Sequence, residues 1–254
     1  AVLLTQAELQ MAHGQFEEAR ATLARLLDSA PNHAQGLGIL ARLHREQKDW
    51  PAIMELLPRL RSGKILPVPE LDAMALGAYR DALVKIEKSK DAAALEAQWS
   101  SIPKAMRKNP ELVKAWIRGL KACGQSAKAE SVIRKHLKQS WDSELALEYS
   151  HLKVEDKTKH LSRAEAWLVN RGDDPLLLLA VARLSMRNEL WGKARSYLET
   201  SLSIKPSAEA YQLYGRLLEK LGESVNASEA FRSGLTLATH LGEDLPALER
   251  PRHR

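Results

Sequence analysis

The stretch YQLYGRLLEKLGESVNASEAF, from Tyr211 to Phe231, decides the fold class. Its apolar residues recur at helical spacing on either side of Gly222, which breaks the pattern in the middle. A small residue, Gly215, lies in the first half, and a small residue followed by a bulky one, Ala227 and Phe231, lies in the second. Because small residues let helices approach and large ones fill the gap, the stretch predicts a helical hairpin.

The same pattern recurs elsewhere along the chain. At an offset of 33 residues upstream, the equivalent positions hold Leu178, Val181, Ala182, Ser185, Ala194 and Leu198. Near the N-terminus, one half-unit contains Gly14, Ala19, Leu23, Leu26 and Pro31, and the next unit contains Leu37, Leu40, Ala41, His44, Ile53, Leu57 and Leu60. Asp174 and Pro175 suit the start of a helix, as N-cap and first helical residue. This recurring order is the tetratricopeptide (TPR) signature.

The middle of the chain is less regular. Pro69 to Lys88 and Asp91 to Lys108 look like a longer helix pair, and Trp141 to His160 looks like part of a shortened one. We therefore predict an all-α, TPR-like right-handed α-solenoid of about six helix pairs. Its expected parts are N-terminal TPR-like pairs over 1–68, central irregular helix pairs over 69–141, C-terminal TPR-like pairs over 142–240 and a flexible tail over 241–254.

Composition narrows the class of protein. Hydrophobic residues make up 44% of the chain and charged residues 28%, which is typical of a folded domain and excludes disorder for most of its length. The longest apolar run, from Leu176 to Val181, is far shorter than the roughly 20 residues that cross a bilayer. The net charge of +6 favours acidic partners. The single cysteine, Cys123, excludes an internal disulfide framework.

A basic surface is predicted at one repeat position. The residue that follows the small position of the first helix is an arginine in four units, namely Arg42, Arg118, Arg183 and Arg216. Further cations fall near them on the same helical face, namely Arg45, Lys114, Lys121, Arg187 and Lys220. Arginine holds carboxylates through paired hydrogen bonds, so acidic peptides, chain-end carboxylates and porphyrin propionates all suit this surface. The alternative is that these arginines are good helix formers on a solvated face.

Nothing in the sequence indicates catalysis, and no metal site or required cofactor is predicted. The eight histidines are scattered, without an H-E-x-x-H pair, although a single axial haem ligand needs no motif. Phosphate-binding loops, serine nucleophile elbows and Cys-x-x-Cys motifs are also missing. Nucleic-acid binding is the main rival function for a basic helical repeat. It is not favoured, because the charge is modest and no repeated pair of base-reading side chains occurs.

Three segments of the chain resemble the HemY family of bacterial inner-membrane proteins. They are Asp49 to Pro58 (DWPAIMELLP), Leu95 to Trp99 (LEAQW) and Glu229 to Leu235 (EAFRSGL). The chain also lacks the G-x-G-x-x-G of a dinucleotide fold, which excludes the flavin-dependent oxidase that shares the family's name.

The resemblance implies a location and a role. HemY-like proteins carry two N-terminal transmembrane helices, so we expect this chain to be the domain without its anchor, on the cytoplasmic side of the bacterial inner membrane. We expect a non-catalytic scaffold or regulator of late haem biosynthesis that binds pathway enzymes through a TPR groove. The alternative is a domain that binds or senses haem or porphyrin directly.

Overall fold

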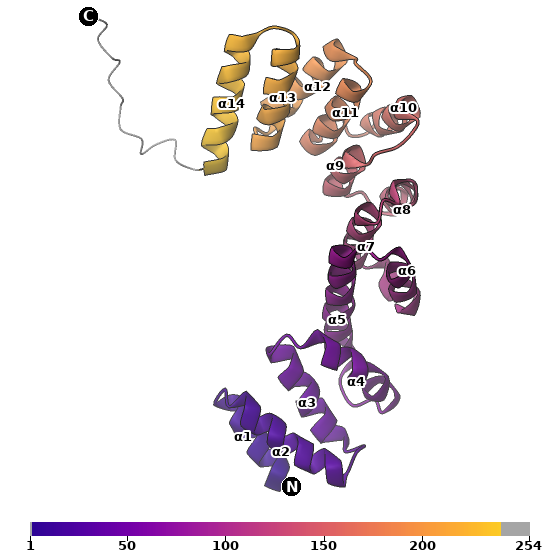
Figure 1. The fold of residues 1–254 in the computed structure, drawn as a ribbon, viewed down its shortest axis with the longest axis vertical. Helices are drawn as coiled ribbons and strands as arrows, with labels where there is room; N and C mark the ends of the chain where they lie inside the picture. Colours follow the sequence, from indigo (N-terminus) through magenta and orange to yellow (C-terminus); the bar gives the residue numbers. More distant parts are fainter. Residues whose placement is uncertain (1, 240–254) are drawn as a thin grey trace, which may run out of the picture. The chain divides into compact units, whose positions relative to one another are not determined.

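The computed structural model describes residues 2–239, and these residues form helices and connections without a strand (Figure 1). The expected tail, 241–254, lies outside the described residues. The α-helices are α1 (Val2–Ala12), α2 (Phe16–Ser29), α3 (Ala34–Glu46), α4 (Trp50–Ser62), α5 (Val68–Ser89), α6 (Ala92–Ser101), α7 (Pro110–Ala122), α8 (Ser126–Gln139), α9 (Ser143–His151), α10 (Lys157–Leu168), α11 (Pro175–Arg187), α12 (Trp191–Ile204), α13 (Ala208–Lys220) and α14 (Ser224–Thr239). The all-α prediction is confirmed.

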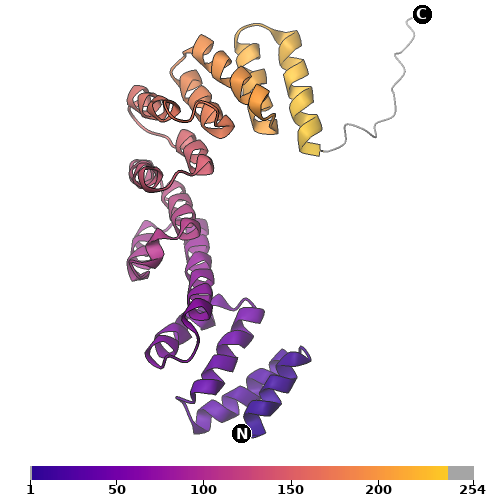
Figure 2. The ribbon, with the colours of Figure 1, turned by 180° about the vertical axis from the view of Figure 1, so that it is seen from behind.

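The helices fall into two compact units, one over residues 1–125 and the other from Ser126 onward. Within each unit, helices that follow one another in the chain pack together, as α13 and α14 do in both Figure 1 and Figure 2. In the second unit α11 also contacts α9 and α13, so the first helices of successive pairs are neighbours. This stacking of helix pairs is the arrangement of an α-solenoid.

Turn residues and caps explain where the helices begin and end. Gly14, Gly124 and Gly222 have φ values of 72°, 74° and 82°, the left-handed conformation that glycine adopts without strain. Asp174 caps α11 as predicted, because its carboxylate accepts hydrogen bonds from the backbone N–H groups of Leu176 and Leu177. The repeat signature in the sequence therefore marks real helix boundaries.

The irregular middle differs from the prediction in its lengths. α5 has 22 residues, close to the expected Pro69 to Lys88. The following helix was expected to reach Lys108 but α6 ends at Ser101, and only a short 3-10 turn follows over Met106–Lys108. Pro103 explains the early end, because proline disfavours a helical conformation at the residue before it and has no N–H to donate.

No helix within residues 2–239 combines the length and the apolar character that a membrane span requires.

Small residues face bulky ones where helices meet. A methyl group built on Gly215 of α13 would lie 2.5 Å from Cε1 of Phe231 on α14. A methyl group on Gly77 of α5 would similarly lie 2.4 Å from the Trp50 ring of α4. These distances are well inside van der Waals contact, so the backbone at each glycine is pressed against an aromatic ring.

We expect Gly215→Ala to lower the free energy of unfolding by about 1 to 3 kcal/mol, although alanine is the better helix former, because the new methyl group overpacks the α13–α14 contact. Urea unfolding followed by circular dichroism measures the change. The additional substitution Phe231→Leu should recover part of the loss by removing the opposing ring.

The matched control is Gly192→Ala on α12, where a methyl group would meet nothing within 4 Å. This variant should unfold at the same urea concentration as the parent or slightly higher. Equal destabilisation by both alanines would contradict a steric role for Gly215.

Candidate binding surface

The predicted basic residues lie on first helices of the pairs, and they divide between the two units. The first unit carries Arg42 and Arg45 on α3 with Lys114, Arg118 and Lys121 on α7, here called the α3/α7 set. The second unit carries Arg183 and Arg187 on α11 with Arg216 and Lys220 on α13, here called the α11/α13 set. Each set is described by itself.

In the α3/α7 set, Arg42 is held by a carboxylate. Its Nε and Nη2 donate hydrogen bonds of 2.8 and 3.0 Å to the two carboxylate oxygens of Glu70, in the first turn of α5. Arg45 lies 3.6 Å from the same carboxylate. The paired hydrogen bonds hold the pKa of Glu70 below, and that of Arg42 above, their ordinary values. This arginine therefore ties α3 to α5.

The rest of the α3/α7 set lies on α7. The guanidinium of Arg118 is 3.6 Å from the carboxylate of Glu87 on α5. Lys114 and Lys121 are half-buried and also interact with neighbouring residues. A further ion pair of 2.8 Å joins Arg80 of α5 to Glu111 in the first turn of α7. The cations of the first unit are thus interleaved with carboxylates.

In the α11/α13 set, one carboxylate serves several cations. Arg183 forms an ion pair with Glu209 in the first turn of α13, and the Nε2 of His151 lies 3.3 Å from the same carboxylate. The hydrogen bond from His151, followed by the charge of Arg183, lowers the pKa of Glu209. Burial lowers the pKa of Arg183, and the nearby guanidinium of Arg216 adds to that effect. Glu209 is therefore the ion-pair partner of Arg183, and the other charged neighbour of Arg183 on α13, Arg216, is also a cation.

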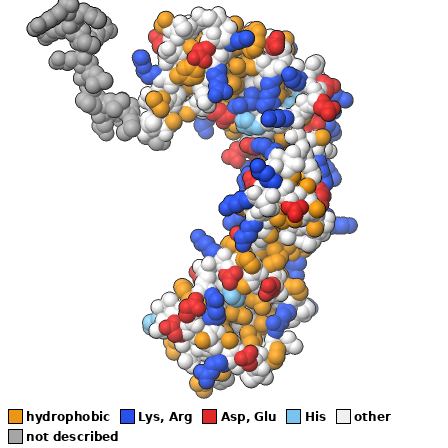
Figure 3. All heavy atoms as spheres, viewed as in Figure 1, with side chains coloured by type: hydrophobic (Ala, Val, Ile, Leu, Met, Phe, Trp, Pro, Cys, Tyr) orange, Lys and Arg blue, Asp and Glu red, His pale blue; other side chains and the backbone are white. Residues whose placement is uncertain are grey.

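Three of the four members of the α11/α13 set, all except Arg183, have no carboxylate partner among the described residues. Arg216 is exposed on α13 without an ion pair, and Arg187 donates its only hydrogen bond, of 2.9 Å, to the backbone carbonyl of Leu152. Lys220 lies with its ammonium 5.7 Å from the centre of the Trp191 ring. In Figure 3, blue Lys and Arg side chains gather beside histidine over α9 and α11. The α11/α13 set thus contains a surplus of positive charge that no carboxylate among the described residues pairs with.

Sequence reasoning missed a recurring carboxylate that pairs with an arginine of the preceding first helix. Glu70, Glu111 and Glu209 all lie in the first turn of a first helix, where the helix dipole favours a negative charge. Each pairs with an arginine of the preceding first helix, 26 to 31 residues earlier in the chain. An acidic residue at this repeat position is the signal that could have found them.

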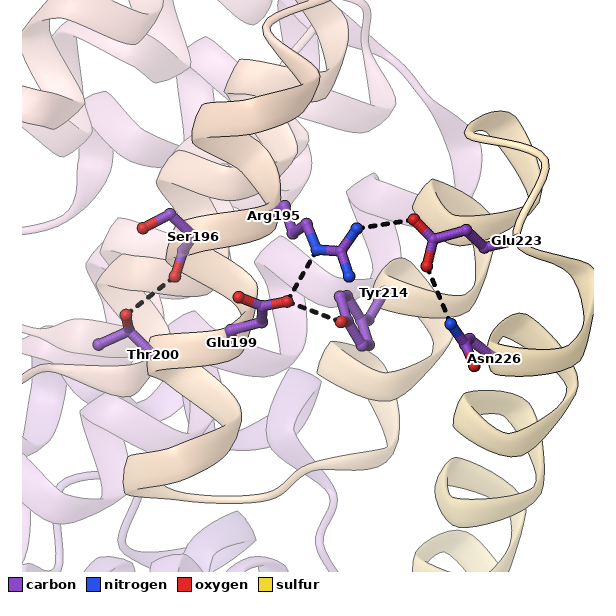
Figure 4. A network of polar contacts seen from close by, with 7 residues as sticks. All are labelled: Arg195, Ser196, Glu199, Thr200, Tyr214, Glu223 and Asn226. Carbon is purple, nitrogen blue, oxygen red and sulfur yellow. Dashed lines mark hydrogen bonds and ion pairs between the residues drawn. The ribbon is translucent and has the colours of Figure 1, made fainter.

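A separate polar network joins helices of the last two pairs (Figure 4). Arg195 of α12 donates to Glu199, at 2.9 Å, and to Glu223, at 2.7 Å, before α14. The Tyr214 hydroxyl donates to Glu199 at 2.8 Å, and Asn226 donates to Glu223 at 2.9 Å. These hydrogen bonds raise the pKa of Arg195 and lower the pKa values of both glutamates. Because its charges are mutually paired, we assign this network to the joining of repeats.

The histidines include one unusual member. His160 is 2% exposed, packs against Tyr149 with ring centres 4.1 Å apart, and leaves its Nε2 without a hydrogen-bond partner. It borders a cavity of about 280 Å³. Pockets that hold drug-sized ligands measure about 300 to 1,000 Å³, so this cavity lies just below that range, and we derive no haem chemistry from it.

The comparisons with known proteins agree with the repeat architecture. Models of the tetratricopeptide repeat match residues 1–43 and 208–240. HemY of Escherichia coli K12 is 22% identical over 236 residues, which are 93% of this chain and 59% of that protein, and HemY of Shigella flexneri matches equally. The chain therefore spans about three-fifths of the curated relatives it matches. The expected resemblance is confirmed, and the chain is a HemY-like domain of TPR repeats.

Solved structures with similar helical arrangements include MamA and the Cut9–Hcn1 hetero-tetramer of the APC/C. A MamA crystal structure is 17% identical, covers 69% of this chain and 98% of its own, and has a TM-score of 0.46. The Cut9–Hcn1 structure is 14% identical, covers 94% of this chain and 60% of its own, and has a TM-score of 0.41.

We expect Glu70→Gln to lower the free energy of unfolding at pH 7 by about 1 kcal/mol or less, because the Arg42 side chain is 45% exposed and water screens the pair. The folded-state pKa of Glu70 is depressed, so its contribution is present above the unfolded pKa and is lost as the pH falls through the folded pKa. Urea unfolding at pH 7 and at successively lower pH should show the difference from the parent shrinking.

The control for this experiment is Glu55→Gln, which removes an exposed carboxylate of α4 that forms no ion pair with the described residues. Its stability should follow that of the parent over the whole pH range. A Glu70→Gln deficit that persists unchanged in acid would rule out the ion pair as its cause.

Proposed function

We propose that this HemY-like domain is a non-catalytic scaffold whose helix pairs bind proteins, and that its partners are enzymes of late haem biosynthesis. Stacked helix pairs present extended surfaces that such repeat proteins use for binding. The link to haem biosynthesis rests on the resemblance to HemY, of which the chain spans 59%. The proposal requires no cofactor.

The observation that carries the proposal is the surplus of positive charge in the α11/α13 set. Arg216 is exposed and has no ion pair among the described residues, and it lies close enough to Arg183 to affect its pKa. A guanidinium group in this state offers paired hydrogen-bond donors to an incoming carboxylate. We therefore propose that acidic segments of partner proteins bind along α11 and α13.

The arrangement of charge favours a protein partner over a nucleic acid. Glu209 lies beside Arg183, and Glu148 lies 3.8 Å from His151 in the same region. A continuous polyanion would be repelled by these carboxylates, whereas a folded partner presents both signs of charge and can match them. The predicted preference against nucleic acid remains part of the proposal.

We also propose that the whole protein acts at the cytoplasmic face of the bacterial inner membrane, with transmembrane helices outside this chain serving as the anchor. Confinement to the membrane surface would raise the effective concentration of the scaffold near membrane-bound enzymes. This location rests on the resemblance to HemY. The partners proposed for the whole protein there are the same haem-pathway enzymes.

We expect Arg216→Gln to reduce the recovery of haem-pathway enzymes in an affinity pull-down from bacterial membranes by about tenfold, because a charge-assisted hydrogen bond contributes about 1.5 to 3 kcal/mol. Quantitative mass spectrometry of the recovered proteins measures the change. Arg216 is the residue of choice because Arg183 also joins repeats, so its removal would confuse binding with stability.

The control is Arg232→Gln on α14, which removes the same charge from an exposed arginine of the same helix pair. Its recovery of pathway enzymes should equal that of the parent. No enrichment by the parent over an unrelated TPR domain would overturn the scaffold proposal. Direct haem or porphyrin binding stays the alternative, and a titration followed by absorbance would detect it as a stoichiometric spectral change.

A further inference from the structure

The cavity beside His160 lies within the second unit, between the α9–α10 connection, α10 and the end of α11. It has a volume of about 280 Å³. The lining residues that matter for its chemistry are three cations, two further polar residues and two apolar ones, namely Lys153, Lys157, Arg187, His160, Asn188, Val154 and Leu184. None of these residues belongs to the ion pairs that join the repeats.

The lining of the cavity is unbalanced in charge. Its three cationic side chains face no carboxylate within the lining, and Lys153 and Lys157 are exposed without ion pairs. The acidic residues next to them in sequence are Glu155, which does not line the cavity, and Asp156. The carboxylate of Asp156 already accepts a hydrogen bond of 2.8 Å from the backbone N–H of Lys159, as the cap of α10. The positive charge of the lining therefore has no carboxylate partner among the described residues.

Arg187 is the strongest anion-binding group of the cavity. Its side chain is half-buried, and burial together with the charge of Arg183 lowers its pKa. One nitrogen, Nη1, is held by the carbonyl of Leu152 at 2.9 Å, which fixes the guanidinium against the cavity wall. A partly desolvated cation without a carboxylate is unfavourable, so an incoming anion would offset that cost.

The rim of the cavity is fixed in place. The side-chain nitrogen of Asn188 donates to the carbonyls of Lys157, at 3.1 Å, and Leu184, at 2.8 Å, and thereby joins the start of α10 to the end of α11. On the inner side, the His160 ring packs against Tyr149. Burial holds the pKa of His160 down to about 4, so its imidazole is neutral at pH 7 and adds a polar group without charge. A cavity with such fixed walls is pre-organised for binding.

We propose that this cavity binds a small organic acid, with its carboxylate held by Arg187, Lys153 and Lys157 and its short hydrocarbon part against the apolar side formed by Val154 and Leu184. Inorganic phosphate satisfies the cations but not the apolar wall, so a carboxylate on a short carbon chain fits the lining better. The inference does not depend on which proteins the domain binds, because the cavity is lined by the α9–α10 connection, α10 and the end of α11, and not by Arg216 or any other residue of α13.

Glutarate is the probe for the first experiment, with the uncharged glutaramide as its matched control compound. Each is titrated into the domain at constant ionic strength, and the imidazole nitrogen signals of His160 are followed by NMR. We expect saturable shifts with glutarate, with a Kd on the order of 1 mM, and none with glutaramide. Inorganic phosphate should bind more weakly than glutarate.

The variant is Lys153→Gln with Lys157→Gln, and its control is Lys159→Gln with Lys205→Gln, which removes two exposed lysines of the same unit outside the cavity. We expect the first pair to weaken glutarate binding about fivefold and the second to leave it unchanged. Equal weakening of glutarate binding by both pairs of substitutions would attribute the effect to the net charge of the domain and would contradict a specific site. Absence of a saturable His160 shift, or tighter binding of phosphate, would overturn the proposal.

Discussion

The close approach of helices at small residues is the constraint on which the rest of the structure depends. At Gly77 and Gly215 the helix backbone lies directly against the rings of Trp50 and Phe231. The first of these contacts joins successive helix pairs, and the second acts within one pair. A hairpin of amphipathic helices cannot bury its apolar face alone, so stacking at this separation is what removes the apolar residues from water.

Charge pairing follows the same stacking. Once first helices are neighbours, an arginine in the middle of one lies opposite the first turn of the next, as Arg42 lies opposite Glu70 and Arg183 opposite Glu209. The carboxylate is already favoured there by the dipole of its own helix, and the guanidinium adds two directed donors. Arginine at this repeat position therefore has a role in joining repeats, which neither the purely solvated nor the purely ligand-binding explanation included.

Most helix boundaries could be predicted from the sequence, because the hydrophobic period and the turn and cap residues act locally. Gly222 and Asp174 decide their turns and caps through contacts within a few residues, and these can be read without knowing the fold. The early end of α6 before Pro103 is also a local effect and could have been predicted. The partners of the basic residues could not be predicted in this way. They lie on the next first helix, and which residues meet depends on the stacking register.

The distinction between paired and unpaired arginines decides where a ligand can add free energy. At Arg42 an incoming carboxylate must displace Glu70, so the gain is only the difference between two similar ion pairs. At Arg216 and Arg187 no carboxylate has to leave, and the whole interaction is available to the ligand. Arg187 is also partly withdrawn from water, where each hydrogen bond to an anion is stronger than on an exposed face. The basic surface predicted from the sequence is thus a structural framework at some positions, and the binding surface proposed here is confined to positions where the framework leaves a guanidinium without a carboxylate partner.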